Sequence, residues 1–198
     1  MKSKTIFFLL FLGYLGVGYV PNLIAVDKMA TQFFYLGILN ILGLFCLAYF
    51  KKGLFFINKY SFITFFGLIL WSISSYFYAF NKGEVFIYSN KIFIFLTSFL
   101  VIYSLLREIE LNKTKFIFLI ILLLIFEILW INALFILRFN ISEGRDMGLR
   151  AFTGNINITG IALLFKIPFL VFGINEFKGV LKKALIILLP ISIFTVLL

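Results

Sequence analysis

Long apolar stretches alternate with short polar ones along the whole chain. Crossing the ~30 Å hydrocarbon core of a bilayer takes ~20 apolar residues of α-helix. Residues 116–137 are apolar on every side of a helix, whereas strands of an outer-membrane barrel would alternate polar and apolar positions. Because backbone hydrogen bonds must close within each span, the pattern predicts an all-α, polytopic transmembrane helix bundle. We expect about seven spans, at residues 5–24, 32–50, 61–80, 87–106, 116–137, 157–174 and 184–198.

The two ends of the chain carry further expectations. Lys2 and Lys4 precede an apolar run, as in a secretory signal peptide, but no small-x-small cleavage site follows, which favours a retained first helix. The last apolar stretch continues to Leu198 without a polar anchor, so we expect the chain to be the N-terminal portion of a longer membrane protein. Residues 1–198 are predicted to form a single transmembrane helical domain.

Composition supports the membrane assignment and removes several kinds of chemistry. The sequence is 63% apolar and only 13% charged, which does not suit a soluble surface. It contains no histidine, so no Ser-His-Asp triad or His-ligated metal site can form. Its single cysteine, Cys46, allows no intramolecular disulfide. No metal and no cofactor are expected.

The distribution of basic residues predicts the orientation. With the N-terminus in the cytoplasm, eleven basic residues fall on the inner side and six on the outer side, which follows the positive-inside rule. The cations behind the formal net charge of +10 are scattered over the loops, with at most three in each, and membrane anchoring explains them, so nucleic acid is not an expected partner. The inner residues are Lys2, Lys4, Lys51, Lys52, Lys59, Arg107, Lys113, Lys115, Lys178, Lys182 and Lys183; the outer ones are Lys28, Lys82, Lys91, Arg138, Arg145 and Arg150.

Two ionisable residues fall near the middle of predicted spans. Glu127 is ~16 Å from the inner end of its span and Lys166 is ~14 Å below the outer surface, at 1.5 Å per residue. An isolated charge at that depth costs ~2.5 to 3.5 kcal/mol, and consecutive antiparallel helices are usually neighbours. We therefore predict an intramembrane ion pair between Glu127 and Lys166. The pair would fix helix packing or relay protons or ions; the remaining alternative is that the two side chains make no contact.

Uncharged polar residues also lie within the spans. Asn40, Asn132 and the serines at 72, 74 and 75 are expected to hydrogen-bond between helices. Trp71 falls in the middle of a span, whereas tyrosines at 76, 78 and 88 fall near the outer interface. Such rings anchor a helix at the membrane surface and could also stack on sugar rings; anchoring is the favoured interpretation.

The segment 138–160 is a polar interruption of 23 residues with three arginines, three asparagines and four glycines. It is predicted to be an extracytoplasmic loop. Arg145 and Arg150 would offer fork-like donors to phosphate oxygens, and Asn155 and Asn157 precede a helix whose first N–H groups attract anions. The segment therefore suits a site for an anionic ligand. The alternative is a solvated loop in which Asn155 caps the helix and the arginines touch lipid headgroups.

This segment resembles a motif of the O-antigen ligase and O-antigen polymerase superfamily. The run GLRAFTGNINITGIALL at residues 148–164 is similar to the arginine, glycine and Asn-Pro-Asn pattern that leads into a span in that family. Residues 27–36 (DKMATQFFYL) with Asn40, and residues 71–84 (WSISSYFYAFNKGE), are similar to the family's early helices and their outer ends. The resemblance covers the whole chain and corresponds to the family's N-terminal half. Ile156 stands where the family has proline.

The resemblance implies glycosyl transfer on the outer face of the bacterial inner membrane by a multi-pass protein. The donor would be a glycan on undecaprenyl pyrophosphate, and the acceptor a lipid A core, another glycan or a protein, with membrane lipids as surroundings. No nucleotide sugar, metal or cofactor is needed, since the lipid pyrophosphate is an activated leaving group. Arg150 matches the motif arginine and is the first candidate for binding it; Arg145 is the second, from local chemistry.

Other interpretations remain open. The family's main catalytic loop lies in its second half, so no catalytic residue is assigned and this chain alone is expected to be inactive. A transporter or flippase for lipid-linked sugars or ions would instead use Glu127 and Lys166. A non-catalytic membrane subunit that packs against partners is a third possibility.

Overall fold

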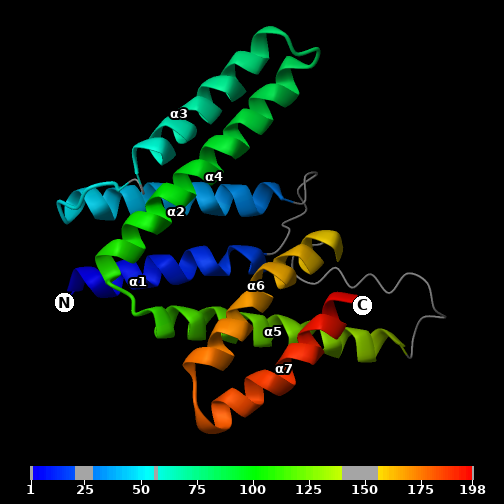
Figure 1. Ribbon diagram of the computed structural model, residues 1–198. Helices are drawn as coiled ribbons and strands as arrows, with labels where there is room; N and C mark the ends of the chain where they lie inside the picture. Colours follow the sequence, from blue (N-terminus) through cyan, green and yellow to red (C-terminus); the bar gives the residue numbers. More distant parts are fainter. Residues whose placement is uncertain (1, 21–28, 56–57, 140–155, 198) are drawn as a thin grey trace. The chain divides into compact units, whose positions relative to one another are not determined.

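The protein is helical throughout the part that the structure describes. The computed structural model describes residues 2–20, 29–55, 58–139 and 156–197, and these contain helices and no strand (Figure 1). This confirms the predicted all-α class. The elements are α1 (Lys2–Leu15) with a 3-10 turn η1 (Gly16–Tyr19), α2 (Ala30–Tyr49), α3 (Lys59–Ser74) with a 3-10 turn η2 (Ser75–Phe77), α4 (Lys82–Ile109), α5 (Lys113–Phe139), α6 (Ile156–Glu176) and α7 (Gly179–Leu197).

Five of these helices are long and apolar enough to cross a membrane. They lie at Ala30–Tyr49, Lys59–Phe77, Lys82–Ile109, Lys113–Leu137 and Gly179–Val196. A shorter apolar helix covers Ser3–Tyr19. The chain is therefore a membrane protein by length and composition of its helices.

Local capping explains where two of the helices begin. The side chain of Asn58 accepts a hydrogen bond from the Ser61 backbone N–H (2.8 Å), and the side chain of Asn81 accepts one from the Glu84 N–H (3.3 Å). Each satisfies a donor that the first helical turn leaves free. Because of the second cap, α4 starts at Lys82, five residues before the apolar stretch predicted at 87–106.

The helices group into two compact units, Met1–Glu110 and Leu111–Leu198. In the first unit, the C-terminal half of α4 packs on α1 and α2, around the buried side chains of Phe7, Leu39, Leu47, Val101 and Leu105. The approach is close: a Cβ added to Gly43 would lie 2.5 Å from a methyl carbon of Val101. Glycine at this position therefore allows α2 and α4 to touch.

The N-terminal half of α4 pairs with α3 to form a hairpin that extends beyond α2 in the first unit (Figure 1). No residue of α3 is buried. The Ser72 hydroxyl donates a hydrogen bond to the Ser89 hydroxyl (2.7 Å) and joins the two helices. The hairpin thus exposes apolar side chains on both of its faces.

The second unit consists of α5, α6 and α7. Its core contains a stripe along α5, formed by Ile117, Ile121, Leu124, Ile128 and Ile131, which repeats every three or four residues as one face of a helix does. Leu163 and Leu170 of α6 and Leu185 of α7 complete this core. A Cβ on Gly173 would lie 2.6 Å from the Ile121 Cδ1 atom, so α5 and α6 also approach closely at a glycine.

Candidate functional site

The polar segment falls mainly outside the described residues. Arg145, Arg150 and Asn155 lie there, so their contacts stay predictions. Asn157 belongs to the first turn of α6 and Arg138 to the last turn of α5, and their side chains are likewise outside the description. The two helices that flank the segment are described, and they define the end of the second unit from which it leaves.

The second unit has one strongly basic end. Helices α5 and α6 are antiparallel neighbours, because Ile121 lies against Gly173 and Glu127 against Lys166. The start of α5, the end of α6 and the start of α7 therefore meet, and Lys113 forms an ion pair with Glu176 there. Further lysines at this end are Lys115, Lys178, Lys182 and Lys183. Segment 138–160 connects α5 to α6 at the opposite end.

The first unit has two ion pairs at one end. The start of α1 meets the end of α4, where Lys4 pairs with Glu110 at 2.7 Å, and Lys52 beyond α2 pairs with Glu108 at 2.6 Å. The Arg107 guanidinium lies 4.0 Å from the ring centre of Phe55, as a cation–π contact. The ion pairs Lys4–Glu110 and Lys52–Glu108 thus lie at the end of this unit that carries the N-terminus, whereas Lys82 and Lys91 make cation–π contacts elsewhere in the unit.

The structure brings Glu127 and Lys166 together. The Lys166 Nζ atom lies 2.6 Å from each carboxylate oxygen of Glu127, and the side chains are only 22% and 16% exposed. One group comes from the middle of α5 and the other from the middle of α6. The contact neutralises both charges inside an apolar bundle, which is the condition for keeping them at that depth.

Neutral polar side chains link the helices elsewhere. Tyr14 donates to the Asn40 side-chain oxygen (2.8 Å), and the Asn40 amide donates to the Ile94 carbonyl (3.0 Å), so one buried asparagine joins α1, α2 and α4. In the second unit, the Asn132 amide donates to the Thr195 hydroxyl (2.8 Å), between α5 and α7. The expected interhelical role of Asn40, Asn132 and Ser72 is confirmed.

The other two predicted serines behave differently. The Ser74 hydroxyl donates to the Trp71 carbonyl (2.8 Å) and the Ser75 hydroxyl to the Ser72 carbonyl (2.6 Å), within their own helical segment. Such bonds to the preceding turn satisfy the hydroxyl without a partner helix. The structure thus gives these two hydroxyls a local role.

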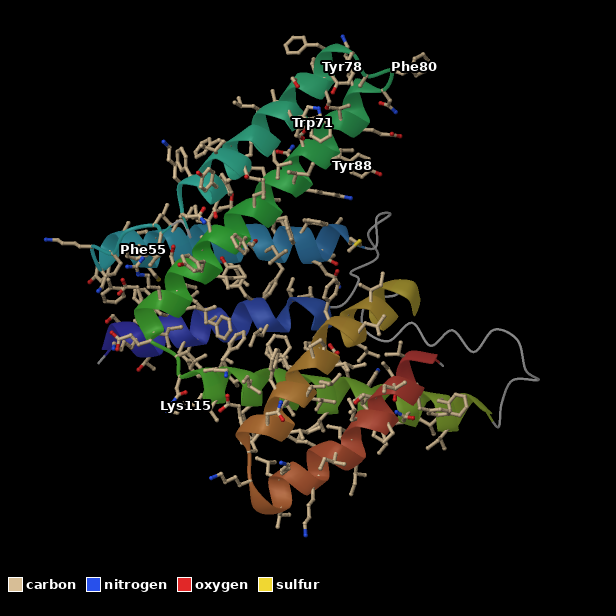
Figure 2. All side chains as sticks on the ribbon, in the orientation of Figure 1. Phe55, Trp71, Tyr78, Phe80, Tyr88 and Lys115 are labelled. Atoms are coloured by element: carbon tan, nitrogen blue, oxygen red, sulfur yellow. The ribbon has the colours of Figure 1, made fainter. Side chains whose placement is uncertain are left out.

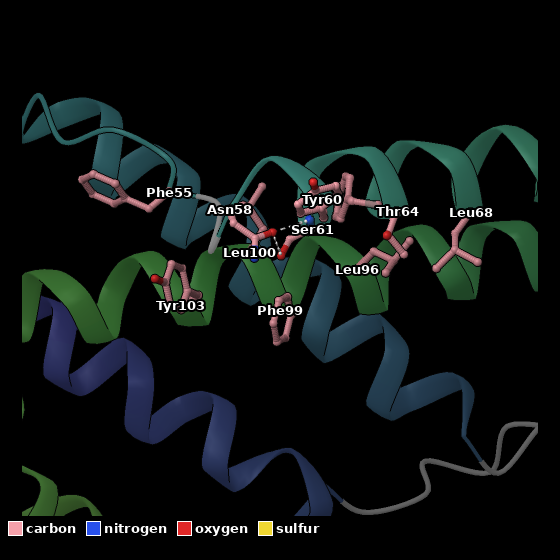
Figure 3. A pocket seen from close by; sticks show the side chains of 11 residues that line it. Phe55, Asn58, Tyr60, Ser61, Thr64, Leu68, Leu96, Phe99, Leu100 and Tyr103 are labelled. Atoms are coloured by element: carbon pink, nitrogen blue, oxygen red, sulfur yellow. Dashed lines mark hydrogen bonds between the residues drawn. The ribbon is translucent and has the colours of Figure 1, made fainter.

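Three cavities lie along the α3/α4 hairpin, and sequence reasoning found none of them. One, of about 400 Å³, lies at the start of α3, where Asn58, Ser61 and Tyr103 contribute polar groups (Figure 3). The other two, of about 510 and 350 Å³, lie toward the hairpin's far end and share Ser72 and Ser89. A sequence signal exists for the two cavities near the far end, in the density of aromatic and serine residues at 71–80, which contributes nothing to the lining of the first cavity.

Each unit thus contains polar contacts between its helices, and each has an ion pair at a helix end. Among the described residues, no three His, Cys, Asp or Glu side chains gather as a metal site would require. Comparison with protein-family models, with curated proteins and with solved structures finds no match to this chain.

Proposed function

We propose that this chain supplies the membrane helices and the pyrophosphate-binding loop of an O-antigen ligase-like or polymerase-like glycosyltransferase in the bacterial inner membrane. In this proposal the chain makes seven spans, its N-terminus is cytoplasmic, and segment 138–160 faces outward. The sugar would come from an undecaprenyl pyrophosphate carrier and go to a lipid A core, a glycan or a protein.

One observation carries the proposal. The arginine-rich segment joins α5 to α6 at the end opposite Lys113, Lys115 and Lys178. Lysines at one end of a bundle are typical of the cytoplasmic side, and outer arginines oppose that tendency. Three arginines gathered in the segment 138–160 on the other side therefore call for an anionic ligand there, and a lipid pyrophosphate at the membrane surface supplies one.

The chemistry needs charge stabilisation. The bond between the sugar anomeric carbon and the pyrophosphate oxygen breaks, the acceptor hydroxyl oxygen bonds to that carbon, and the hydroxyl proton is released. Negative charge grows on the departing pyrophosphate. The guanidinium groups of Arg150 and Arg145 would bind its oxygens more strongly as that charge develops, which lowers the barrier.

The test is Arg150→Ala in the gene at its native locus, with Lys178→Ala as a control that removes a cation from the opposite end. We expect glycan transfer to fall about 100-fold or more in the first variant, as when an electrostatic stabiliser is removed, while lipid-linked donor accumulates. The control should keep normal transfer. Unchanged surface glycan and donor turnover in Arg150→Ala would reject the proposal.

A transporter or flippase is the second candidate, and the buried Glu127–Lys166 pair is the observation that favours it. The double variant Glu127→Gln/Lys166→Met removes both charges and keeps similar side-chain volumes. If the pair carries transport, this variant should lose export of the lipid-linked sugar while transfer chemistry stays intact. If the pair holds helices together, both activities should survive.

A further inference from the structure

The larger of the two far cavities has a composition unlike a lipid-facing groove. Its volume is about 510 Å³, and it lies between the C-terminal part of α3 and the N-terminal part of α4. This volume is within the range of about 300 to 1,000 Å³ for small-molecule sites. Its apolar lining includes Trp71, Tyr78, Phe80 and Tyr88. Figure 2 shows these four residues together toward the tip of the hairpin, contributed by α3, the turn and α4.

Polar groups line the same cavity. Asn81 and Glu84 line it beside the turn, and Ser72 and Ser89 line it where the helices meet. Among the described residues, Glu84 forms no ion pair, so its carboxylate keeps its accepting capacity for a ligand. Asn81 uses its side-chain oxygen to cap α4, which leaves its NH₂ group to donate.

The aromatic rings offer broad exposed faces. Trp71 is 68% exposed, Tyr78 70% and Tyr88 59%. The Lys91 ammonium group lies 5.4 Å from the Tyr88 ring centre, so that ring already has a cation partner. Trp71 and Tyr78 are therefore the better surfaces for stacking. A flat, amphipathic ring surface beside hydrogen-bonding groups matches a pyranose, which has an apolar C–H face and a rim of hydroxyls.

A membrane-interface belt is the competing explanation. Belt residues need only reach the headgroup level, whereas these rings line a cavity that also contains a carboxylate. Glu84 would repel a lipid phosphate, but it accepts hydrogen bonds from sugar hydroxyls. Glu84 is the one residue of this lining that is charged at neutral pH, since Lys82 and Lys91 are not among the lining residues. The charge of the lining thus favours a neutral or amino sugar over a phospholipid.

We propose that this cavity is a sugar-binding subsite, in which Trp71 and Tyr78 stack on a pyranose ring and Glu84 and Asn81 hydrogen-bond to its hydroxyls. The Ser72–Ser89 hydrogen bond fixes the wall between this cavity and its neighbour. The inference rests on the proposed function, because it takes a glycan at the outer surface as the ligand.

Tryptophan fluorescence provides a direct test, since the chain has only two tryptophans. In the variant Trp130→Phe, Trp71 is the sole reporter. The protein in lipid nanodiscs would be titrated with the repeat-unit oligosaccharide released from the cell's own surface polysaccharide. We expect a saturable change in Trp71 emission. No saturable change with the oligosaccharide, or a saturable change with short-chain phosphatidylglycerol alone, would overturn the subsite.

Matched variants locate the binding. Tyr78→Ala and Glu84→Gln should each weaken oligosaccharide binding about tenfold. Phe95→Ala removes an equally exposed ring of α4 that lines none of the three cavities and should leave binding unchanged. Equal effects of Tyr78→Ala and Phe95→Ala would contradict the assignment.

The two proposals can fail separately. If Arg150→Ala abolishes transfer while Tyr78→Ala and Glu84→Gln leave oligosaccharide binding unchanged, the subsite is wrong and the glycosyl transfer stands. If the cavity binds the oligosaccharide while Arg150→Ala leaves transfer unchanged, the subsite stands and the glycosyltransferase proposal is wrong.

Discussion

The two units differ in the polar groups that they hold between their apolar helices. The unit of α1–α4 places neutral groups in its interior, Tyr14 and Asn40, and keeps its ion pairs at helix ends. The unit of α5–α7 places a charged pair, Glu127 and Lys166, midway along its helices. Leaving a neutral buried group without its hydrogen bond costs about 1 to 3 kcal/mol, whereas breaking a buried ion pair costs about 3 to 5 kcal/mol. The difference predicts which contacts are most sensitive to substitution.

The ion pair should give the largest effect. Lys166→Met removes the Lys166 ammonium group from beside the Glu127 carboxylate and breaks a largely buried ion pair. We expect a loss of about 3 to 5 kcal/mol in the free energy of unfolding. The double variant Glu127→Leu/Lys166→Met removes both charges and should recover most of that loss. Reversible unfolding in mixed micelles measures both. If the double variant lost as much unfolding free energy as Glu127→Leu and Lys166→Met lose together, the result would contradict the pairing.

Close helix contacts should give the next largest effect and should also differ between the units. Gly43→Ala would drive a methyl group against Val101, which is fully buried and β-branched, so we expect a loss of about 1 to 3 kcal/mol. Gly173→Ala meets the flexible end of Ile121, and its loss should be smaller.

Gly37→Ala is the matched control for these contacts, since nothing lies within 4 Å of a Cβ there. Alanine has a higher helix propensity than glycine, so this variant should be as stable as the native protein or slightly more stable. Thermal unfolding in detergent ranks the three variants. A Gly37→Ala variant that is less stable than Gly43→Ala would contradict the packing of α2 on α4.

The neutral network should be less sensitive than the ion pair. Asn40→Ala removes the acceptor of Tyr14 and a donor to the Ile94 carbonyl, and we expect a loss of about 1 to 2 kcal/mol. Tyr14→Phe should cost about half as much, since it breaks only one hydrogen bond. A larger loss of unfolding free energy in Asn40→Ala than in Lys166→Met would contradict the comparison.

The exposed pair at the end of α4 should give the smallest effect. The hydrogen bond and charge of Lys4 lower the pKa of the Glu110 carboxyl. A lowered carboxyl pKa stabilises the folded state above the ordinary pKa, and this contribution is lost as the pH falls through the folded value. Lys4→Gln should return the pKa of Glu110 toward its ordinary value with little change in stability, as a ¹³C carboxyl titration would measure. An unchanged Glu110 titration would disprove the contact.

The sequence predicts features that depend on the length of an apolar run or on the depth of a residue along its helix. The apolar runs predicted the helices, and the 1.5 Å rise put Glu127 and Lys166 at one level. Contacts between helices were missed, because they depend on which side of a helix faces its neighbour. A helix that is apolar all round, such as α5, gives no signal for its buried face.

For that reason the stripe from Ile117 to Ile131, the Gly43–Val101 contact and the Tyr14–Asn40 hydrogen bond were not predictable. The cavities were missed for the same reason, since Trp71 and Glu84 are 13 residues apart and meet only through the hairpin. The contacts of Arg145, Arg150 and Asn155 stay predictions.

The most direct test asks which side of the membrane the arginine-rich segment occupies. In a Cys46→Ser background, Arg145→Cys places a single thiol in the arginine-rich segment, and Lys178→Cys places one at the basic end of the second unit. The account predicts that a membrane-impermeant maleimide labels Arg145→Cys in intact spheroplasts and labels Lys178→Cys only after permeabilisation. Labelling of Lys178→Cys from outside, with Arg145→Cys protected until the membrane is opened, would contradict the orientation and the glycosyl transfer that depends on it.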